Sequence, residues 1–134
     1  MSVSPPAQYV IGGALDAPFY PTLPEPYFKG FKGTPGPGDT FYTWIAPFDI
    51  ELLGVAMACE TYDIEDNWSL IVDGRYIAET IYTKDLPEGL HFMTCKYIKK
   101  GQKVFFKYTN TGEPKSIWFN YQCLRDEDVI DIVE

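Results

Sequence analysis

Three carboxylates lie within one short segment of the chain: Asp63, Glu65 and Asp66 precede Asn67, and Asp73 follows a few residues later. Two carboxyl groups about 5–9.5 Å apart can hydrolyse a glycosidic bond. The same oxygen-rich turn could bind Ca²⁺, although it lacks the spacing of an EF-hand loop. Because the chain holds 19 acidic residues, some clustering is expected. We therefore predict solvated turn carboxylates here, rather than a glycosidase pair or a metal site.

Nucleophilic catalysis is not indicated by the rest of the chain. His91 is the single histidine, and no Gly-x-Ser-x-Gly motif is present. A nucleophile needs a base within hydrogen-bond reach. Cys95 lies four residues from His91, which on a strand is about 13 Å. We therefore expect no enzymatic activity and no cofactor.

The three cysteines, Cys59, Cys95 and Cys123, are widely spaced, and each lies in an apolar segment. An odd number of thiols cannot all pair within one chain, and no Cys-x-x-Cys spacing points to zinc. The cysteines are predicted to be buried and reduced.

The aromatic residues are better candidates for binding, because a flat ring on a β-surface can stack on the face of a sugar. The candidates for such stacking are Trp44, Trp68, Tyr62 and Tyr76. The run Ile117-Trp-Phe-Asn-Tyr121 alternates as a half-buried strand does, so several aromatic rings must instead belong to a core.

The net charge of −8 argues against non-specific nucleic-acid binding, which depends on lysine and arginine contacts to phosphates. No apolar run approaches the roughly 20 residues of a membrane-spanning helix. The N-terminus lacks the basic and apolar regions of a secretory signal. We expect a soluble protein made in the cytoplasm, without nucleic-acid or membrane partners.

The strongest structural signal is the dipeptide Asp73-Gly74 between two runs of β-branched and aromatic residues. It predicts a hairpin with strands over 68–72 and 75–82. Residues 50–62 could form a helix by length alone, but Gly54 and the flanking turn residues favour a strand. Further strand-like runs occupy the segments 39–46, 91–98, 104–108 and 116–124. Seven or eight such strands predict an all-β protein, with one antiparallel, jelly-roll-like β-sandwich over residues 39–124.

The first 38 residues differ in composition, since they hold eight of the 11 prolines and six of the 11 glycines. Proline lacks an amide donor, which excludes a helix or a central strand there. Residues 1–38 are predicted to be an extended arm that ends in a hinge over 30–38. Its aromatic residues Phe19, Tyr20, Tyr27 and Phe28 are the candidates for protein contacts. Residues 125–134 are expected to form an acidic tail or an edge strand.

Residues 41–124 resemble a small β-sandwich found in tail proteins of siphophages of Gram-positive bacteria, and in particular the shoulder domain of lactococcal phage receptor-binding proteins. The resemblance rests on Phe48-Asp-Ile-Glu-Leu-Leu-Gly-Val55, Asn67-Trp-Ser-Leu-Ile-Val-Asp-Gly74, Ile81-Tyr-Thr-Lys-Asp-Leu-Pro-Glu-Gly89 and Trp118-Phe-Asn-Tyr121.

This resemblance implies a non-enzymatic structural or adaptor module of a phage tail or baseplate, with other tail proteins as partners. The protein would then be made in the host cytoplasm and enter the virion tail, where it takes part in host attachment. The alternative is a carbohydrate-binding module that binds a saccharide of the host cell wall. The sequence leaves the oligomeric state open.

Overall fold

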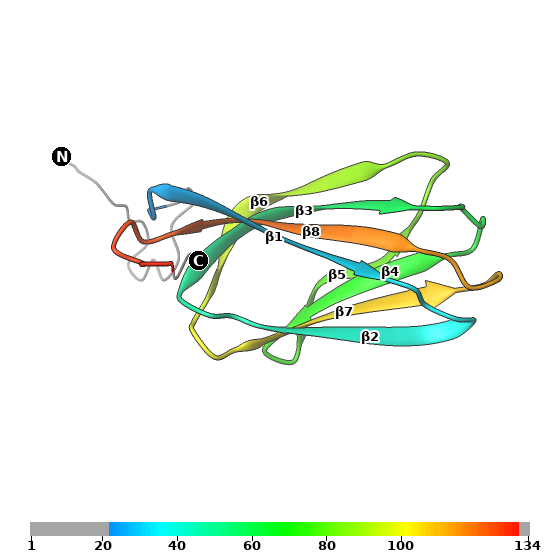
Figure 1. Cartoon of the computed structure of the whole chain (residues 1–134), viewed down its shortest axis with the longest axis horizontal. Helices are drawn as coiled ribbons and strands as arrows, with labels where there is room; N and C mark the ends of the chain where they lie inside the picture. The colour runs from blue at the N-terminus through cyan, green and yellow to red at the C-terminus, as the bar shows by residue number, and fades with distance from the viewer. Residues whose placement is uncertain (1–21, 132–134) are drawn as a thin grey trace, which may run out of the picture.

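The computed structural model describes residues 22–131. This part of the chain contains no helix, and its eight β-strands form two antiparallel four-stranded sheets (Figure 1). The strands are β1 (Glu25–Gly33), β2 (Gly38–Ile45), β3 (Ile50–Cys59), β4 (Asn67–Val72), β5 (Arg75–Tyr82), β6 (Glu88–Ile98), β7 (Lys103–Asn110) and β8 (Ile117–Arg125). The predicted all-β sandwich is confirmed.

The two sheets lie face to face. The first sheet has the order β1-β8-β3-β6, and the second has the order β2-β7-β4-β5, which is the arrangement of an eight-stranded jelly roll. One side of the sandwich is therefore formed by the edge strands β1 and β2, and the opposite side by β5 and β6. Within residues 22–131 no helix has the length and hydropathy needed to cross a membrane.

The hairpin predicted at Asp73-Gly74 is confirmed. Val72 pairs with Arg75, and the two turn residues have φ angles of 54° and 73°. Both values are positive, as a type I′ turn requires, and glycine tolerates this conformation best.

The core lies between the sheets and is rich in aromatic rings. The rings of Phe106 (β7) and Phe119 (β8) meet across the sandwich at 4.0 Å between centroids, and Trp68 packs against both. Inward side chains alternate with outward ones along β7 and β8, as a two-layer fold demands. Truncating a buried phenylalanine typically costs about 3–5 kcal/mol. A Phe106→Ala change would therefore remove much of the stability of a domain of this length.

The prediction of an extended arm over residues 1–38 is wrong for residues 25–33, which form a strand of the first sheet. Residues Glu25–Gly33 form β1, an edge strand paired with β8 along its whole length, so the segment expected to begin a hinge at residue 30 is part of a sheet. Pro26 is compatible with this position because an edge strand has one side free of hydrogen bonds. The candidate contacts Phe19 and Tyr20 lie outside the described residues.

Three other predictions can be compared with the structure. Residues 50–59 are a strand, as favoured over a helix. At the C-terminal end, residues 126–131 contain a turn and no strand, so an edge strand is not formed within them. The three cysteines are free and buried, as predicted, and burial raises the pKa of the Cys123 thiol to about 12.

Candidate functional site

The acid-rich turn before β4 binds a lysine from a distant loop. Lys115, between β7 and β8, donates hydrogen bonds to Asp63 and to Oδ2 of Asp66, the latter at 2.6 Å. The side chains of Lys115 and Asp66 are 2% and 0% exposed, whereas Asp63 is partly exposed. We name Asp63, Asp66 and Lys115 the buried cluster. The prediction of a solvated turn is wrong for Asp66, because the ammonium of Lys115 replaces water as its partner.

Both carboxylate oxygens of Asp66 accept two hydrogen bonds each. Oδ1 accepts from the backbone amide and the hydroxyl of Thr111, each at 2.7 Å, and Oδ2 accepts from the Tyr108 hydroxyl at 2.6 Å. Burial opposes ionisation of Asp66, but hydrogen bonds from Lys115, Tyr108 and Thr111 outweigh it and lower the pKa of this carboxyl. Burial likewise opposes the charge on Lys115, and its two carboxylate partners outweigh that effect and raise the lysine pKa.

The loop that holds Lys115 is shaped by Asn110. The Asn110 amide donates to the carbonyls of Pro35 and Glu113, and its oxygen accepts from the amide of Gly112. A Cβ atom at Gly112 would collide with the carboxylate of Asp63, so a larger residue there would require the Asp63 side chain to move away from its present position. Sequence reasoning missed Lys115. The only signal was a lysine two positions before the first residue of β8, Ile117.

At the other end of the sandwich, Arg125 lies between Glu25 and Asp131. Its Nε donates to Glu25 at 2.7 Å, and its terminal nitrogens bind Asp131 at 3.0 and 2.7 Å. Hydrogen bonds first to Asp131 and then to Glu25 raise the arginine pKa. The guanidinium also lies 4.8 Å from the ring centroid of Tyr27. We name Glu25, Arg125 and Asp131 the surface cluster, because Asp131 is exposed and Glu25 only half-buried.

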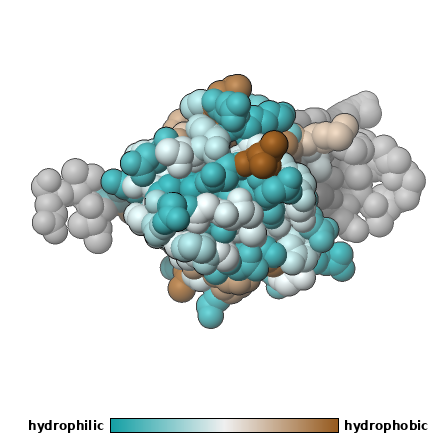
Figure 2. Space-filling view, turned by 90° about the vertical axis from the view of Figure 1, so that its right-hand side faces the viewer, coloured by the Kyte–Doolittle hydropathy of each residue, from teal (hydrophilic) through white to brown (hydrophobic). Residues whose placement is uncertain are grey.

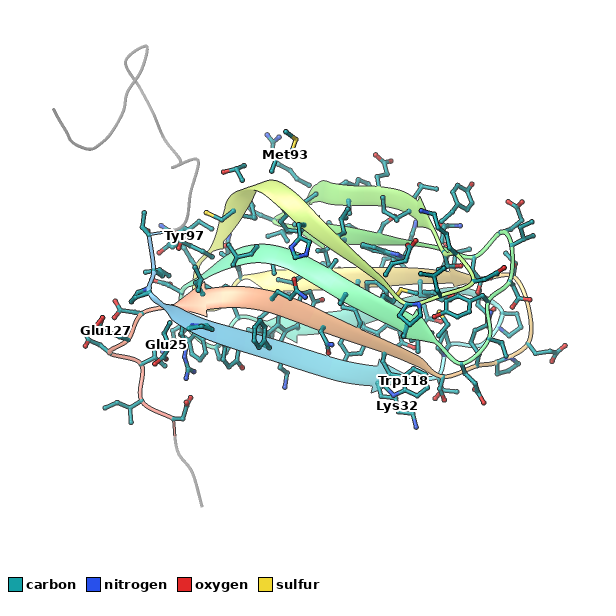
Figure 3. All side chains as sticks on the ribbon, turned by 90° about the horizontal axis from the view of Figure 1, so that it is seen from above. Glu25, Lys32, Met93, Tyr97, Trp118 and Glu127 are labelled. Atoms are coloured by element: carbon teal, nitrogen blue, oxygen red, sulfur yellow. The ribbon has the colours of Figure 1, made fainter. Side chains whose placement is uncertain are left out.

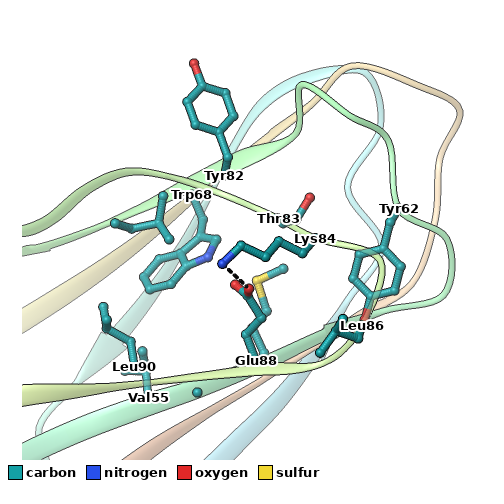
Figure 4. A pocket seen from close by; sticks show the side chains of 12 residues that line it. Val55, Tyr62, Trp68, Tyr82, Thr83, Lys84, Leu86, Glu88 and Leu90 are labelled. Carbon is teal, nitrogen blue, oxygen red and sulfur yellow. Dashed lines mark ion pairs between the residues drawn. The ribbon is translucent and has the colours of Figure 1, made fainter.

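A pocket of about 180 Å³ opens on the side formed by β5 and β6 (Figure 4). Trp68 forms part of its apolar wall, and an ion pair between Lys84 and Glu88, at 3.3 Å, lies among its lining residues. Tyr82 and Tyr62 also line the pocket. Trp68 is 4% exposed, so its ring belongs to the core and cannot stack on a ligand without moving.

The opposite side, formed by β1 and β2, has a wider pocket of about 350 Å³. Trp44 lines it and stacks on Tyr121 with 4.6 Å between ring centroids. Lys29 and Lys32 lie at the same pocket. The hydroxyl of Tyr121 is buried without a hydrogen-bond partner among the described residues. Trp44 therefore lies in a groove, but its stacking partner is a protein side chain.

The outer face of the first sheet carries a hollow of about 380 Å³. Its lining includes Ala56, Ala58 and Gly89, which leave the face shallow, together with Trp118 and Asn120. Trp118 is 42% exposed, and the ammonium of Lys32 lies 5.8 Å from its ring centroid. Figure 3, which views the sandwich from above, places these two side chains together at one end of β1 and β8.

The residues named from sequence do not form one site. Tyr76 and Phe28 are exposed on β5 and β1, at opposite sides of the sandwich. The ring of Tyr27 packs edge-on against that of Phe48, with 4.9 Å between the ring centroids. The Tyr62 hydroxyl accepts a hydrogen bond from the backbone amide of Cys59. The four candidate stacking residues thus include one core ring, and no planar strip joins them. Among residues 22–131 no group of three or more histidine, cysteine or acidic side chains could hold a metal ion.

A family model described as a domain of unknown function (DUF8551) matches residues 34–128, which contain β2 to β8. The chain belongs to this family. β1 precedes the matched residues of this DUF8551 domain.

No curated protein matches the chain. Among solved structures, the crystal structure of FlhE has a TM-score of 0.47 and 9% identity, over 76% of this chain and 100% of that chain. Dimeric latent PorU from Porphyromonas gingivalis has a TM-score of 0.32 and 9% identity, over 91% of this chain and 15% of that chain. Similarities this low support no transfer of function.

Proposed function

We propose that this chain is a non-enzymatic structural or adaptor module of a phage tail or baseplate, and that it binds a neighbouring tail protein through the edge strand β2. The observation that carries the proposal is the character of this edge. Within residues 22–131, β2 pairs only with β7, so its other side offers free backbone donors and acceptors.

The outward face of β2 carries two large apolar side chains, Phe41 and Ile45, beside Asp39 and Thr43. Phe41 is 57% exposed and Ile45 is 54% exposed, and both alternate with the inward residues of the strand. The neighbouring edge strand β1 contains Pro26, Lys29 and Lys32, residue types that discourage pairing between edges. No proline or lysine occurs in β2. An edge strand with two exposed apolar side chains and no proline or lysine suits an extended segment of a partner, which would extend the second sheet by one strand.

The experiment compares two double variants in the phage that encodes the chain. Phe41→Lys with Ile45→Lys places two charges on the β2 edge. Met93→Lys with Ile64→Lys makes the same change at two exposed apolar residues elsewhere. All four side chains are exposed, so each substitution should change the stability by only about 0.5 kcal/mol. Purified particles are then examined by western blotting and immunogold labelling.

We expect the wild-type chain and the Met93/Ile64 variant at the tail, and loss of the Phe41/Ile45 variant from the particles. Absence of the wild-type chain from the particles would contradict a role in the tail. Retention of the Phe41/Ile45 variant would contradict the role of β2.

Saccharide binding remains a second candidate, and the hollow beside Trp118 favours it. An exposed indole ring next to the Asn120 amide, over a floor of alanine and glycine, suits the apolar face and the hydroxyls of a sugar. Calorimetric titration with host cell-wall polysaccharide should then show weak binding that Trp118→Ala abolishes and Tyr76→Ala leaves intact. Equal binding by the two variants would exclude this hollow as the site.

A further inference from the structure

The buried cluster joins two loops that cross between the sheets at the same end of the sandwich. Asp66 ends the connection from β3 to β4, and Lys115 lies in the connection from β7 to β8. In Figure 1 these connections lie at the right-hand end, and Figure 2 shows that the surface there is mainly hydrophilic. The Lys115 side chain is almost entirely enclosed beneath this surface.

The geometry brings the amine of Lys115 and the carboxylate of Asp66 together. Nζ of Lys115 lies 2.6 Å from Oδ2 of Asp66, and both side chains are removed from solvent. Reacting groups that are held in a near-attack geometry can reach effective molarities of about 10⁵–10⁸ M. Condensation of an amine with a carboxylic acid, which is unfavourable in dilute water, becomes favourable at such values.

The groups around the pair match the needs of that condensation. Thr111 directs its amide and its hydroxyl at Oδ1 of Asp66, each at 2.7 Å, where negative charge develops when an amine attacks the carboxyl carbon. Tyr108 donates to Oδ2 at 2.6 Å, the oxygen that must depart as water. Asp63 accepts a hydrogen bond from Nζ, so its carboxylate is placed to take a proton from the ammonium during the reaction.

We propose that Lys115 and Asp66 form an intramolecular isopeptide bond in the mature protein. The ammonium gives a proton to Asp63, and the free amine attacks the carboxyl carbon of Asp66. The carbon–Oδ2 bond then breaks, and Oδ2 leaves with two protons as water. Of the three ammonium protons, one stays on the amide nitrogen and two leave in the water, so Asp63 and Tyr108 end unchanged.

The ion pair is the stable reactant, because the pKa of Lys115 is raised and that of Asp66 lowered. Amide formation is therefore slow, but it happens once per molecule and needs no turnover. Enclosure of both groups then withholds the water that hydrolysis of the amide would require.

The test is the intact mass of the purified full chain, followed by mapping of proteolytic peptides. We expect a chain lighter than its sequence by one water molecule, and a branched peptide that joins the segments around Asp66 and Lys115. A succinimide at Asp73-Gly74 would cause the same loss of mass, so the branched peptide is the decisive signal. A full-length mass, after purification and after long incubation, would overturn the proposal. So would a loss of mass that maps to Asp73.

Two variants sharpen the result. Lys115→Arg keeps a cation beside Asp66 but cannot form the amide, and it should have the full mass. Asp63→Asn leaves Lys115 and Asp66 in place but removes the proton acceptor, and it should leave most of the chain uncondensed. A branched peptide at the wild-type level in Asp63→Asn would contradict the role of Asp63 and with it the proposed mechanism.

Discussion

The buried cluster and the surface cluster have the same composition, one cation between two carboxylates, at opposite ends of one sandwich. In the buried cluster, Lys115 and Asp66 are enclosed and Asp66 has further partners in Tyr108 and Thr111. In the surface cluster, Arg125 holds two carboxylates that water also reaches. Burial therefore makes the main difference between the two.

That difference changes what each cluster contributes. A buried ion pair leaves an uncompensated charge when one partner is lost, whereas an exposed pair is replaced by water and salt ions. Only the buried pair has the enclosure and fixed geometry from which a covalent bond can form. The surface cluster instead ties β1 and the residues after β8 to Arg125 through interactions that salt screens.

The largest effect is expected from loss of the central cation. Lys115→Met keeps most of the side-chain volume but leaves Asp66 buried without its partner, which should reduce the free energy of unfolding by about 3–5 kcal/mol. If the isopeptide bond is present, the variant also loses a cross-link between residues 49 positions apart, worth about 4 kcal/mol in a chain-entropy model. Urea unfolding followed by tryptophan fluorescence measures the loss.

The matched change at the other end is Arg125→Met, for which we expect a clearly smaller decrease in the urea midpoint. Equal decreases for the two variants would show that burial does not separate the clusters.

A second, smaller effect is expected from Tyr108→Phe. The change removes the hydroxyl that donates to Asp66 and interacts with the Cys59 thiol, while the ring stays in the core. Loss of one buried hydrogen bond to a charged group should cost about 1.5–3 kcal/mol. Thermal unfolding of the variant and the wild type would measure it, with Tyr76→Phe as a control on an exposed ring. A Tyr108→Phe protein as stable as the control would mean that the hydroxyl adds nothing to the cluster.

The dependence of stability on pH separates the ion pair from the amide. The pKa of Asp66 is lowered from its ordinary value of 3.8 by Lys115, Tyr108 and Thr111, all of which remain in Asp63→Asn. A carboxyl with a lowered folded-state pKa stabilises the fold above its unfolded pKa, and this stability is lost as the pH falls through the folded pKa.

Asp63→Asn should therefore lose stability below about pH 4. The wild type, in which the proposed amide leaves Asp66 nothing to titrate, should lose less in the same range. Urea midpoints measured across this range would compare the two proteins, and identical acid profiles would count against the amide.

The smallest effect concerns salt. Adding about 1 M NaCl shortens the Debye length to about 3 Å, so the surface cluster should weaken while the buried cluster does not. The difference in stability between wild type and Arg125→Met should then shrink, and the difference between wild type and Lys115→Met should persist. If salt removed both differences equally, the enclosure of Lys115 would be in doubt.

Much of the fold follows from local sequence, because strands and turns have local signals. Asp73-Gly74 specified its hairpin, and the alternation of Ile117 to Tyr121 specified the inward face of β8. β1 was harder to predict, since prolines and glycines mark the segment as extended without saying that β8 pairs with it. That pairing joins residues about one hundred positions apart, from Glu25 to Arg125, and depends on tertiary contacts.

The candidate site could be predicted only in part, because it also depends on a contact between residues far apart in the sequence. Asp63 and Asp66 lie only three positions apart in the sequence, which made the acidic turn recognisable, but their partner Lys115 comes from a loop about fifty residues away. Without that cation, a cluster of acids is expected to be solvated. Trp68 was predicted from its residue type to stack on a ligand at the surface. Its position on β4 instead directs the ring into the core, where it packs against Phe106.

A crystal structure at atomic resolution is the measurement that tests the buried cluster most directly. We predict continuous, planar electron density between Nζ of Lys115 and the carboxyl carbon of Asp66, with an amide bond of about 1.33 Å and the Asp63 carboxylate beside it. Separate density for an ammonium and a carboxylate at hydrogen-bond distance would contradict the covalent link. A Lys115 side chain in solvent would contradict the buried cluster itself.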